Sequence, residues 1–247
     1  TRSCYTGKTG TEKIGSCHTG IQTCLGDSWG SCQGEQVPQA EICDGKDNDC
    51  DGLIDNASNC VTTYAGSGVK GYKDGPALQA QFSTPQKVIV DSNGNLYVLE
   101  KDQHYIRKID TQGNVSTYAG NLSRGLKDGP RQIALFDKIK DITIDHLDNI
   151  YIADYENHRI RKIDPQGNVT TFAGSSQCQS TSDCKQDGPL AQAKFRYPEV
   201  IAVDQLNNFY LVSQDEQGKR VILRIDSNKM IRKSPATQTF TAGYPKT

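Results

Sequence analysis

Hydrophobic positions in the second part of the chain fall in short runs rich in Val, Ile and Tyr, separated by polar turns, most of which contain Gly or Asn. One set of runs lies at about 87–91, 95–100, 105–110 and 114–119, with "SNG", "KDQH" and "TQG" between them. Turns of this composition join antiparallel neighbours, so the pattern predicts four antiparallel strands. No run approaches the ~18 apolar residues that a membrane span requires.

The same pattern recurs along the chain. The run "KVIVDSNGNLYVLE" at 87 is answered by "DITIDHLDNIYIAD" at 141 and "VIAVDQLNNFYLVS" at 200. A four-stranded unit of about 40 to 50 residues is the size of a β-propeller blade, which hides its apolar faces only against the next blade. The sequence therefore predicts an all-β chain that carries about three propeller blades.

The linker "DGPALQAQFSTP" at 74 precedes the first set of strands, and related linkers precede the other two sets. Its Gly and Pro residues indicate a loop, and we expect one helical turn within it. Ala80 and Phe82 are expected to wedge between blades, as are the equivalent Phe136 and Phe195.

The stretch "ADYENHRIRKIDPQGNVTTFAG" at 153 and its counterparts resemble NHL repeats over residues 61–243. That resemblance implies a ring of six blades, of which only three copies are present. "VTTYAG" at 61 looks like an outermost strand without its own blade, so we expect the propeller to begin there and further blades to follow Thr247. A three-blade piece leaves apolar faces open, so it is expected to self-associate; the alternative is a three-blade chain that pairs into a ring.

Composition separates residues 1–60 from residues 61–247. The first part holds seven of the nine cysteines, and 4 Lys/Arg against 9 Asp/Glu, whereas the remainder carries 24 against 20. A segment this short cannot build a large core, which favours disulfides, an oxidising compartment and an exported protein. The acidic first part and the dilute positive charge of the second indicate neither nucleic acid nor anionic membrane as a partner.

The acidic stretch "CDGKDNDCDGLIDN" at 43 fits the pattern D-x-D-x-D-G, in which alternate carboxylates surround a hard cation and glycine permits a sharp turn. Ser58 stands where an EF-hand has its bidentate Glu, and no helix pattern flanks the loop, so this is not an EF-hand. The alternative is an acidic turn without metal. The sequence predicts a structural calcium site with ligands from Asp47, Asp49, Asp51, Leu53 (carbonyl), Asp55 and Asp44.

The cysteine spacing disfavours zinc, because no C-x₂-C pair is present and gaps of six or seven residues suit disulfides. Copper is disfavoured because the acidic stretch lacks His and Met. Cys178 and Cys184 are expected to close their own loop. The seven remaining cysteines are an odd number, so their connectivity stays open.

The first sixty residues, with "CYTGKTGTEKIGSCHTGIQTCLGDSWGSCQGEQVPQAEICDGKDNDCDGLID", resemble along their full length the cysteine-rich acidic module of the MopE-type metal-binding motif. This module occurs in surface and secreted proteins of proteobacteria and myxobacteria. The resemblance implies a bacterial, extracellular or cell-surface protein with a structural metal site and names no catalytic residue.

Candidate catalytic residues are sparse. His104 and His158 are repeat equivalents, which favours a packing or turn role over a catalytic pair. Asp91, Asp145 and Asp204 end the first strands and are expected to cap turns. Arg107, Arg161 and Arg224, with the neighbouring Lys108 and Lys162, suggest either a basic ring or, as we prefer, cross-strand pairs with acids.

The sequence favours a non-catalytic binding scaffold, secreted or at the cell surface, whose propeller face binds a protein or glycan. The alternative is a propeller enzyme of the lyase or lactonase class, with its channel residues partly in further blades.

Overall fold

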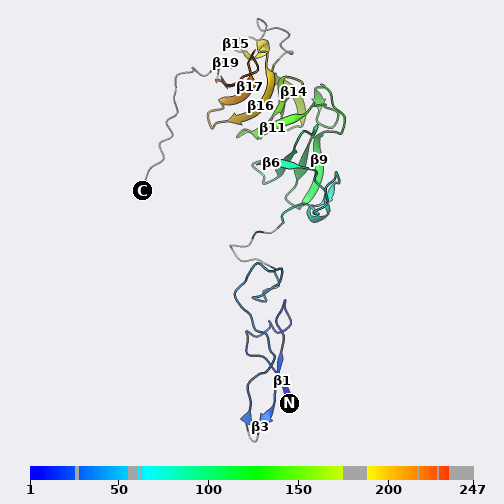
Figure 1. The fold of residues 1–247 in the computed structure, drawn as a ribbon, viewed down its shortest axis with the longest axis vertical. Coiled ribbons are helices and arrows are strands. Elements are labelled where there is room, and N and C mark those ends of the chain that lie inside the picture. The colour runs from blue at the N-terminus through cyan, green and yellow to red at the C-terminus, as the bar shows by residue number, and fades with distance from the viewer. Residues whose placement is uncertain are drawn as a thin grey trace, which may run out of the picture. The chain divides into compact units, whose positions relative to one another are not determined.

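The computed structural model describes residues 1–25, 28–54, 61, 63–174, 188–215, 217–226 and 228–233. They form two compact units, Thr1–Tyr64 and Ala65–Thr247 (Figure 1). The regular structure of both units is almost entirely β, which confirms the predicted all-β class. None of the helices in the described ranges is long and apolar enough to cross a membrane.

The N-terminal unit is held together by small hairpins and disulfides. Strand β1 (Arg2–Cys4) pairs with β2 (Gly20–Gln22), and β3 (Cys24–Leu25) pairs with β4 (Ser28–Trp29). Disulfides join Cys4 to Cys32 and Cys17 to Cys50. Closing loops of about 30 residues contributes roughly 3 to 4 kcal/mol each, mainly by restricting the unfolded chain.

The disulfide pairing spans longer distances than the sequence suggests. Cys17 is closely followed by Cys24, and Cys50 closely follows Cys43, yet Cys17 and Cys50 bond to each other across 33 residues. Both cysteines are buried and form the centre of a unit that has few other buried residues. Cys43 is also disulfide-bonded. The expected Cys178–Cys184 bond lies outside the described residues.

The second unit consists of three five-stranded antiparallel sheets that follow one another along the chain (Figure 1). The first sheet contains β5 (Gly75–Pro76), β6 (Pro85–Val90), β7 (Leu96–Glu100), β8 (Tyr105–Ile109) and β9 (Asn114–Gly120). The second contains β10 (Gly129–Pro130), β11 (Ile139–Ile144), β12 (Ile150–Asp154), β13 (Arg159–Ile163) and β14 (Asn168–Ala173). The third contains β15 (Gly188–Pro189), β16 (Arg196–Val203), β17 (Phe209–Gln214), β18 (Arg220–Ile225) and β19 (Met230–Lys233).

Four strands in each sheet confirm the predicted blade. The fifth strand is the Gly-Pro of the linker, which pairs at the outer edge: Gly75 lies opposite Val115, and Pro76 opposite Asn114. A short 3₁₀ turn follows in the first and third linkers, at Ala77–Gln79 and Leu190–Gln192. The linker is thus partly sheet, where a loop with one helical turn was expected.

The core lies between successive sheets. Phe136 is fully buried and packs with Leu99 of the first sheet and Ile142 of the second. Phe195 is buried in the same way between the second and third sheets. The predicted wedges are therefore confirmed at both junctions, whereas Phe82, at the open end of the first sheet, is only partly buried.

Aspartates cap the hairpin turns, as predicted. Oδ1 of Asp145 accepts the backbone N–H groups of Leu147 and Asn149, both at 2.9 Å. Asp91 and Asp204 make the equivalent bonds in their own repeats. Hydrogen bonds from the Asn208 side chain and backbone lower the pKa of Asp204, so the carboxylate form is the one that stabilises the turn.

The buried arginines form ion pairs with acids and not a basic ring, which was the less favoured of the two interpretations. Arg107 and Arg161 are both fully buried, and each pairs with an acid on the preceding strand, Glu100 or Asp154. Arg161 Nη1 also donates to the carbonyl of Leu135 at 3.0 Å, which ties the linker to the sheet. The preferred cross-strand pairing is thus confirmed for both residues.

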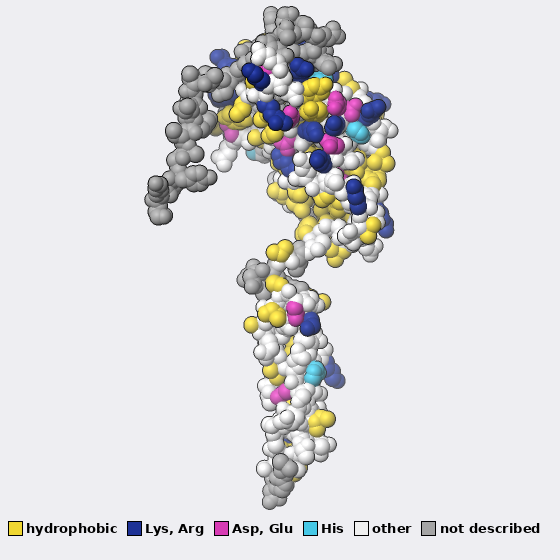
Figure 2. All heavy atoms as spheres, viewed as in Figure 1, with side chains coloured by type: hydrophobic (Ala, Val, Ile, Leu, Met, Phe, Trp, Pro, Cys, Tyr) yellow, Lys and Arg dark blue, Asp and Glu magenta, His cyan; other side chains and the backbone are white. Residues whose placement is uncertain are grey.

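Apolar faces are open at both ends of the described repeats, as expected for three blades. Val88 is 54% exposed, whereas its equivalent Ile142 is buried in the next sheet. Ile222 is 55% exposed, whereas its equivalent Ile160 is buried. Hydrophobic side chains are accordingly visible on the surface of the repeat unit (Figure 2).

Candidate functional site

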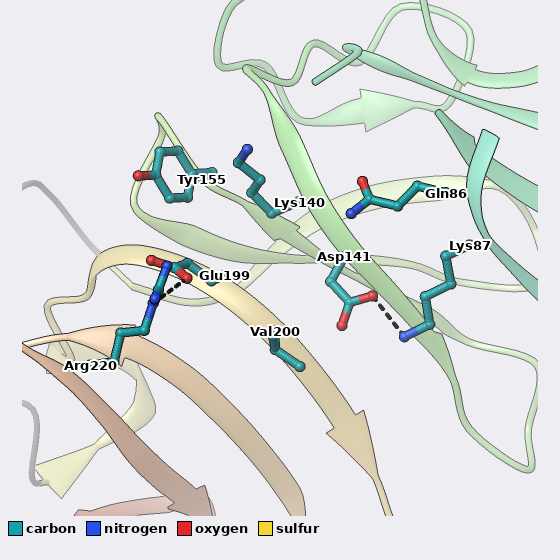
Figure 3. A pocket seen from close by; sticks show the side chains of 8 residues that line it. All are labelled: Gln86, Lys87, Lys140, Asp141, Tyr155, Glu199, Val200 and Arg220. Carbon is teal, nitrogen blue, oxygen red and sulfur yellow. Dashed lines mark hydrogen bonds and ion pairs between the residues drawn. The ribbon is translucent and has the colours of Figure 1, made fainter. Parts of the chain in front are cut away.

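A pocket of about 430 Å³ opens where the first strands of the three sheets begin. Strand β11 contacts both β6 and β16, so the three inner strands lie side by side. The pocket is lined by Gln86, Lys87, Lys140, Asp141, Tyr155, Glu199, Val200 and Arg220 (Figure 3).

The inner-strand residues of this pocket occupy equivalent repeat positions but differ in chemistry. Gln86, Lys140 and Glu199 are one equivalent set. Each falls where the register of its strand shifts against the next strand, between Pro85 and Lys87 in the first sheet, for example. Such bulges redirect side chains and are frequent beside functional sites. A repeated framework thus presents three different polar groups to one space.

The second equivalent set is Lys87, Asp141 and Val200. Lys87 Nζ lies 2.7 Å from Asp141 Oδ1. Asp141 Oδ2 accepts the backbone N–H of Ile201 at 2.9 Å, so this one carboxylate joins all three sheets. Its side chain is only 9% exposed, so we assign Asp141 a structural role: it holds the three inner strands together beneath the pocket.

The remaining lining residues stand on loops and on a strand end. Arg220 is 72% exposed in its side chain and donates from Nε to Glu199 at 2.7 Å. Tyr155 follows β12, and the Lys140 Nζ lies 5.3 Å from the centroid of its ring. The pocket therefore offers an aromatic face beside accessible cationic and anionic groups, which suits a polar ligand.

The histidines act in packing, as predicted from their repetition. His104 Nδ1 accepts the backbone N–H of Lys138 at 2.9 Å, and His158 Nδ1 accepts that of Tyr197 at 3.1 Å. The first bond links the first sheet to the residue before β11, and the second links the second sheet to β16 itself. Burial lowers the pKa of His158, in keeping with a neutral ring that accepts a hydrogen bond.

In the N-terminal unit the acidic loop brings three carboxylates together. Ligand oxygens of Glu41, Asp47 and Asp49 all lie within 4.8 Å of one another. Glu41 Oε1 accepts the backbone N–H of Asp49 at 2.7 Å, whereas Glu41 Oε2 is buried without a hydrogen-bond partner among the described residues. Burial, followed by the charges of Asp51, Glu41 and Asp47, raises the pKa of Asp49.

The other expected ligands are not part of this group of three, although Asp51 lies beside it: its backbone N–H donates to Asp47 Oδ1 and to Asp49 Oδ1, both at 3.2 Å. Asp51 Oδ1 accepts the backbone N–H of the exposed Leu53 at 2.8 Å. Asp44 pairs with Lys46 at 3.3 Å, and hydrogen bonds from Asn48 and Lys46 outweigh burial and lower its pKa. Asp55 lies outside the described residues. Sequence reasoning did not identify Glu41, because it precedes the D-x-D-x-D-G pattern and belongs to no motif position.

The repeat geometry defines a class: the second unit has an NHL-type β-propeller fold. The sequence profile of the Teneurin NHL domain matches residues 126–238. NHL repeat-containing protein 2 of Gallus gallus is 38% identical over 110 residues, which cover 43% of this chain and 15% of the relative. The Homo sapiens protein of that name is 36% identical over 111 residues, with the same coverage. The chain thus spans about one seventh of the length of these curated relatives.

Two solved structures from Bacteroides thetaiotaomicron are similar to part of the chain. A structural genomics protein of unknown function is 27% identical with a TM-score of 0.45, covering 60% of this chain and 34% of that one. An auxiliary nutrient binding protein is 24% identical with a TM-score of 0.44, covering 59% and 36%.

Proposed function

We propose that this protein is an exported, non-catalytic binding scaffold whose propeller unit holds a glycan or protein ligand in the pocket at β6, β11 and β16. One observation carries the proposal: the repeats share their framework but differ in the side chains that face this pocket. In repeat proteins, positions that vary on a constant framework commonly form the binding surface.

The lining residues suit the recognition of hydroxyl and charged groups. Arg220 and Glu199 offer donors and acceptors that are already oriented by their ion pair. The Tyr155 ring supplies a flat apolar face on which a sugar ring or an aliphatic side chain packs. The volume of about 430 Å³ lies in the usual range for small-ligand pockets.

The test is a binding screen of the chain on arrays of oligosaccharides and peptides, repeated with Tyr155→Ala and Lys140→Ala. We expect binding to weaken about tenfold in both variants. Lys101→Ala is the matched control, because Lys101 is the repeat equivalent of Tyr155 and lies outside the pocket. Equal binding by Tyr155→Ala and Lys101→Ala contradicts this location for the site.

We also propose a structural calcium ion in the acidic loop, bound by Asp47, Asp49 and Glu41. Closely placed carboxylates repel one another unless a cation neutralises them, and oxygen ligands suit a hard cation. The buried, unpartnered Glu41 Oε2 supports the proposal, because a bound cation supplies the interaction that this atom lacks.

Calcium titration of the whole chain by calorimetry, with melting curves in EDTA and in calcium, tests this second proposal. We expect saturable binding at about 10⁻⁴ to 10⁻³ M and a higher melting temperature of the N-terminal unit. Asp49→Asn and Glu41→Gln are expected to abolish both effects. Asp44→Asn is the control, because Asp44 pairs with Lys46 instead. An unchanged calcium response in Glu41→Gln would show that Glu41 is no ligand.

Export to an oxidising compartment is supported by the Cys4–Cys32 and Cys17–Cys50 disulfides and by the resemblance of residues 1–60 to surface and secreted modules. Disulfides of this kind persist outside the cytosol. Mass spectrometry of the protein from its native source, alkylated without reduction, checks this: alkylated Cys17 and Cys50 contradict it.

A further inference from the structure

A second cavity, of about 410 Å³, lies between the second and third sheets. It sits at the opposite ends of the inner strands from the first pocket, beside the turns that follow β11 and β16. The second sheet contributes Tyr151, Lys162 and Phe172, and the third contributes Asn207, Phe209 and Lys229.

The equivalent place between the first and second sheets is filled by protein. The guanidinium carbon of Arg131 lies 4.7 Å from the Tyr118 ring centroid, and a Cβ built on Gly167 would meet Arg131 Nη1 at 2.5 Å. Ser92 donates its backbone N–H to Asp148 at 2.9 Å and also its hydroxyl. An arginine plug and a serine–aspartate clasp therefore close the first junction.

The second junction has different residues at each of these repeat positions. Leu190 replaces Arg131, Phe172 replaces Tyr118, Lys229 replaces Gly167, His146 replaces Ser92, and Asn207 replaces Asp148. The plug is therefore absent and the clasp is lost. Within the part of the chain that the structure describes, Asn207 Oδ1 is buried and has no hydrogen-bond partner. A buried acceptor without a donor is costly in free energy and indicates that a donor is missing.

The walls of this cavity are aromatic. The ring centroid of Tyr151 lies 4.9 Å from that of Phe172 and 4.5 Å from that of Phe209. Phe172 and Phe209 lie 5.1 Å apart. Such a cluster favours a flat apolar or aromatic guest through offset or edge-to-face contacts.

Two lysines provide positive charge at the cavity. Lys162 Nζ lies 5.9 Å from the Tyr151 ring centroid. Lys229 has φ of 58°, where the equivalent Gly113 and Gly167 have 77° and 86°. A lysine in this left-handed conformation costs about 1 kcal/mol or more relative to glycine.

The carboxylates at the cavity are already engaged. Asp145 accepts hydrogen bonds from Asn149 and from the Tyr151 hydroxyl within its own turn. Asp226 accepts the backbone N–H of Met230 and lies 3.7 Å from Arg232. Both aspartates keep their negative charge but use their acceptor oxygens within their own turns, and neither lysine forms an ion pair with another of the described residues.

We propose that this cavity binds a small aromatic carboxylate that carries a hydroxyl or amino group on its ring. The carboxylate lies at Lys162 and Lys229, the ring packs on Phe172 and Phe209, and the ring donor bonds to Asn207 Oδ1, which a rotation of the Asn207 side chain turns toward the cavity. This site is separate from the first pocket, and neither proposal depends on the other.

Calorimetric titration of the whole chain with 4-hydroxybenzoate, benzoate and cyclohexanecarboxylate tests the proposal. We expect 4-hydroxybenzoate to bind at least tenfold more tightly than benzoate, since only the former has a donor for Asn207, and cyclohexanecarboxylate to bind weakest. Asn207→Leu is expected to remove the preference for 4-hydroxybenzoate over benzoate.

The double variant His146→Ser with Asn207→Asp rebuilds the clasp of the first junction. It is expected to lose 4-hydroxybenzoate binding while its melting temperature stays equal or rises. Ser92→His with Asp148→Asn, the converse change at the first junction, is the matched control and is expected to keep the affinity. No saturable heat at millimolar ligand, equal affinity for all three acids, or unchanged binding in the rebuilt-clasp variant each overturns the proposal.

Discussion

Replacing Arg161 by leucine removes a guanidinium that is fully buried in the second sheet. Arg161 donates to Asp154 at 2.8 Å and to the carbonyls of Leu135 at 3.0 Å and Lys127 at 2.8 Å. Its loss leaves a buried carboxylate and two linker carbonyls without this donor. Breaking a buried pair from one side costs about 3 to 5 kcal/mol. For a unit of this size that corresponds to a fall of about 10 °C in melting temperature.

The third repeat supplies the compensating change. Leu223 and Ser213 occupy the positions of Arg161 and Asp154 there, and both are buried. We therefore expect Asp154→Ser to restore about 2 to 3 kcal/mol of the free energy of unfolding in the Arg161→Leu background, because no charge is left buried.

Protonation offers a second measure of the same pair. Burial raises the pKa of Asp154 even beside Arg161, and the pKa rises further without the guanidinium. When the pKa of a carboxyl group is higher in the folded chain than its unfolded value of about 3.9, the folded chain loses stability as pH rises from the unfolded-state pKa to the folded-state pKa. Arg161→Leu is thus expected to become more stable from pH 7 to pH 5, relative to the double variant.

Urea unfolding of the wild type, both single variants and the double variant at pH 7 and pH 5 measures these quantities. A cost below about 1 kcal/mol for Arg161→Leu, or strict additivity of the two changes, would refute the reasoning that the pair acts as a buried unit.

Three further outcomes follow from the fold. His158 has a lowered pKa, so the unfolded chain binds its proton more readily; acid titration of urea stability is expected to show a loss as pH falls below about 6.5, and the slope is expected to diminish in His158→Gln. Phe136→Ala is expected to cost about 3 to 5 kcal/mol, and Phe82→Ala clearly less, by denaturant unfolding. Ile222→Asp is expected to reduce concentration-dependent self-association in sedimentation velocity, because it charges an apolar face that is 55% exposed; an unchanged profile assigns association elsewhere.

The blade framework was predictable because its signals are local. Alternating Val, Ile and Tyr positions bounded by Gly and Asn turns gave the four long strands, and their repetition gave the sheets. The Gly75–Pro76 strand was not predictable, since two residues have no periodicity and their pairing depends on Val115, far along the chain. The pairing of Arg107 was predictable, but its full burial was not. Its partners include the carbonyls of Gln81 and Lys73, which are distant in sequence and carry no sequence signal.

The candidate site was harder to predict, because the residues that the repeats share define the framework, whereas the pocket is lined by residues in which the repeats differ. The structure was needed to show that three unlike residues line one pocket: Gln86, Lys140 and Glu199. A usable signal was present nonetheless: these positions break the repeat at the start of each inner strand. The acidic loop shows the opposite limit: its motif includes Asp47 and Asp49, but nothing in the motif indicates that Glu41 lies beside them.

In the first pocket, residues that hold the strands together differ from residues that are presented to a ligand, and this difference has a consequence for protein engineering. Asp141 anchors Ile201 and Lys87 and must be kept, whereas Gln86, Lys140 and Glu199 sit at bulges where side chains leave the interblade core. Codons at these three positions, with those of Tyr155 and Arg220, can be randomised together to select new specificities by display. The repeat unit is thereby a candidate scaffold for artificial recognition proteins whose combining surface is encoded at five separate places.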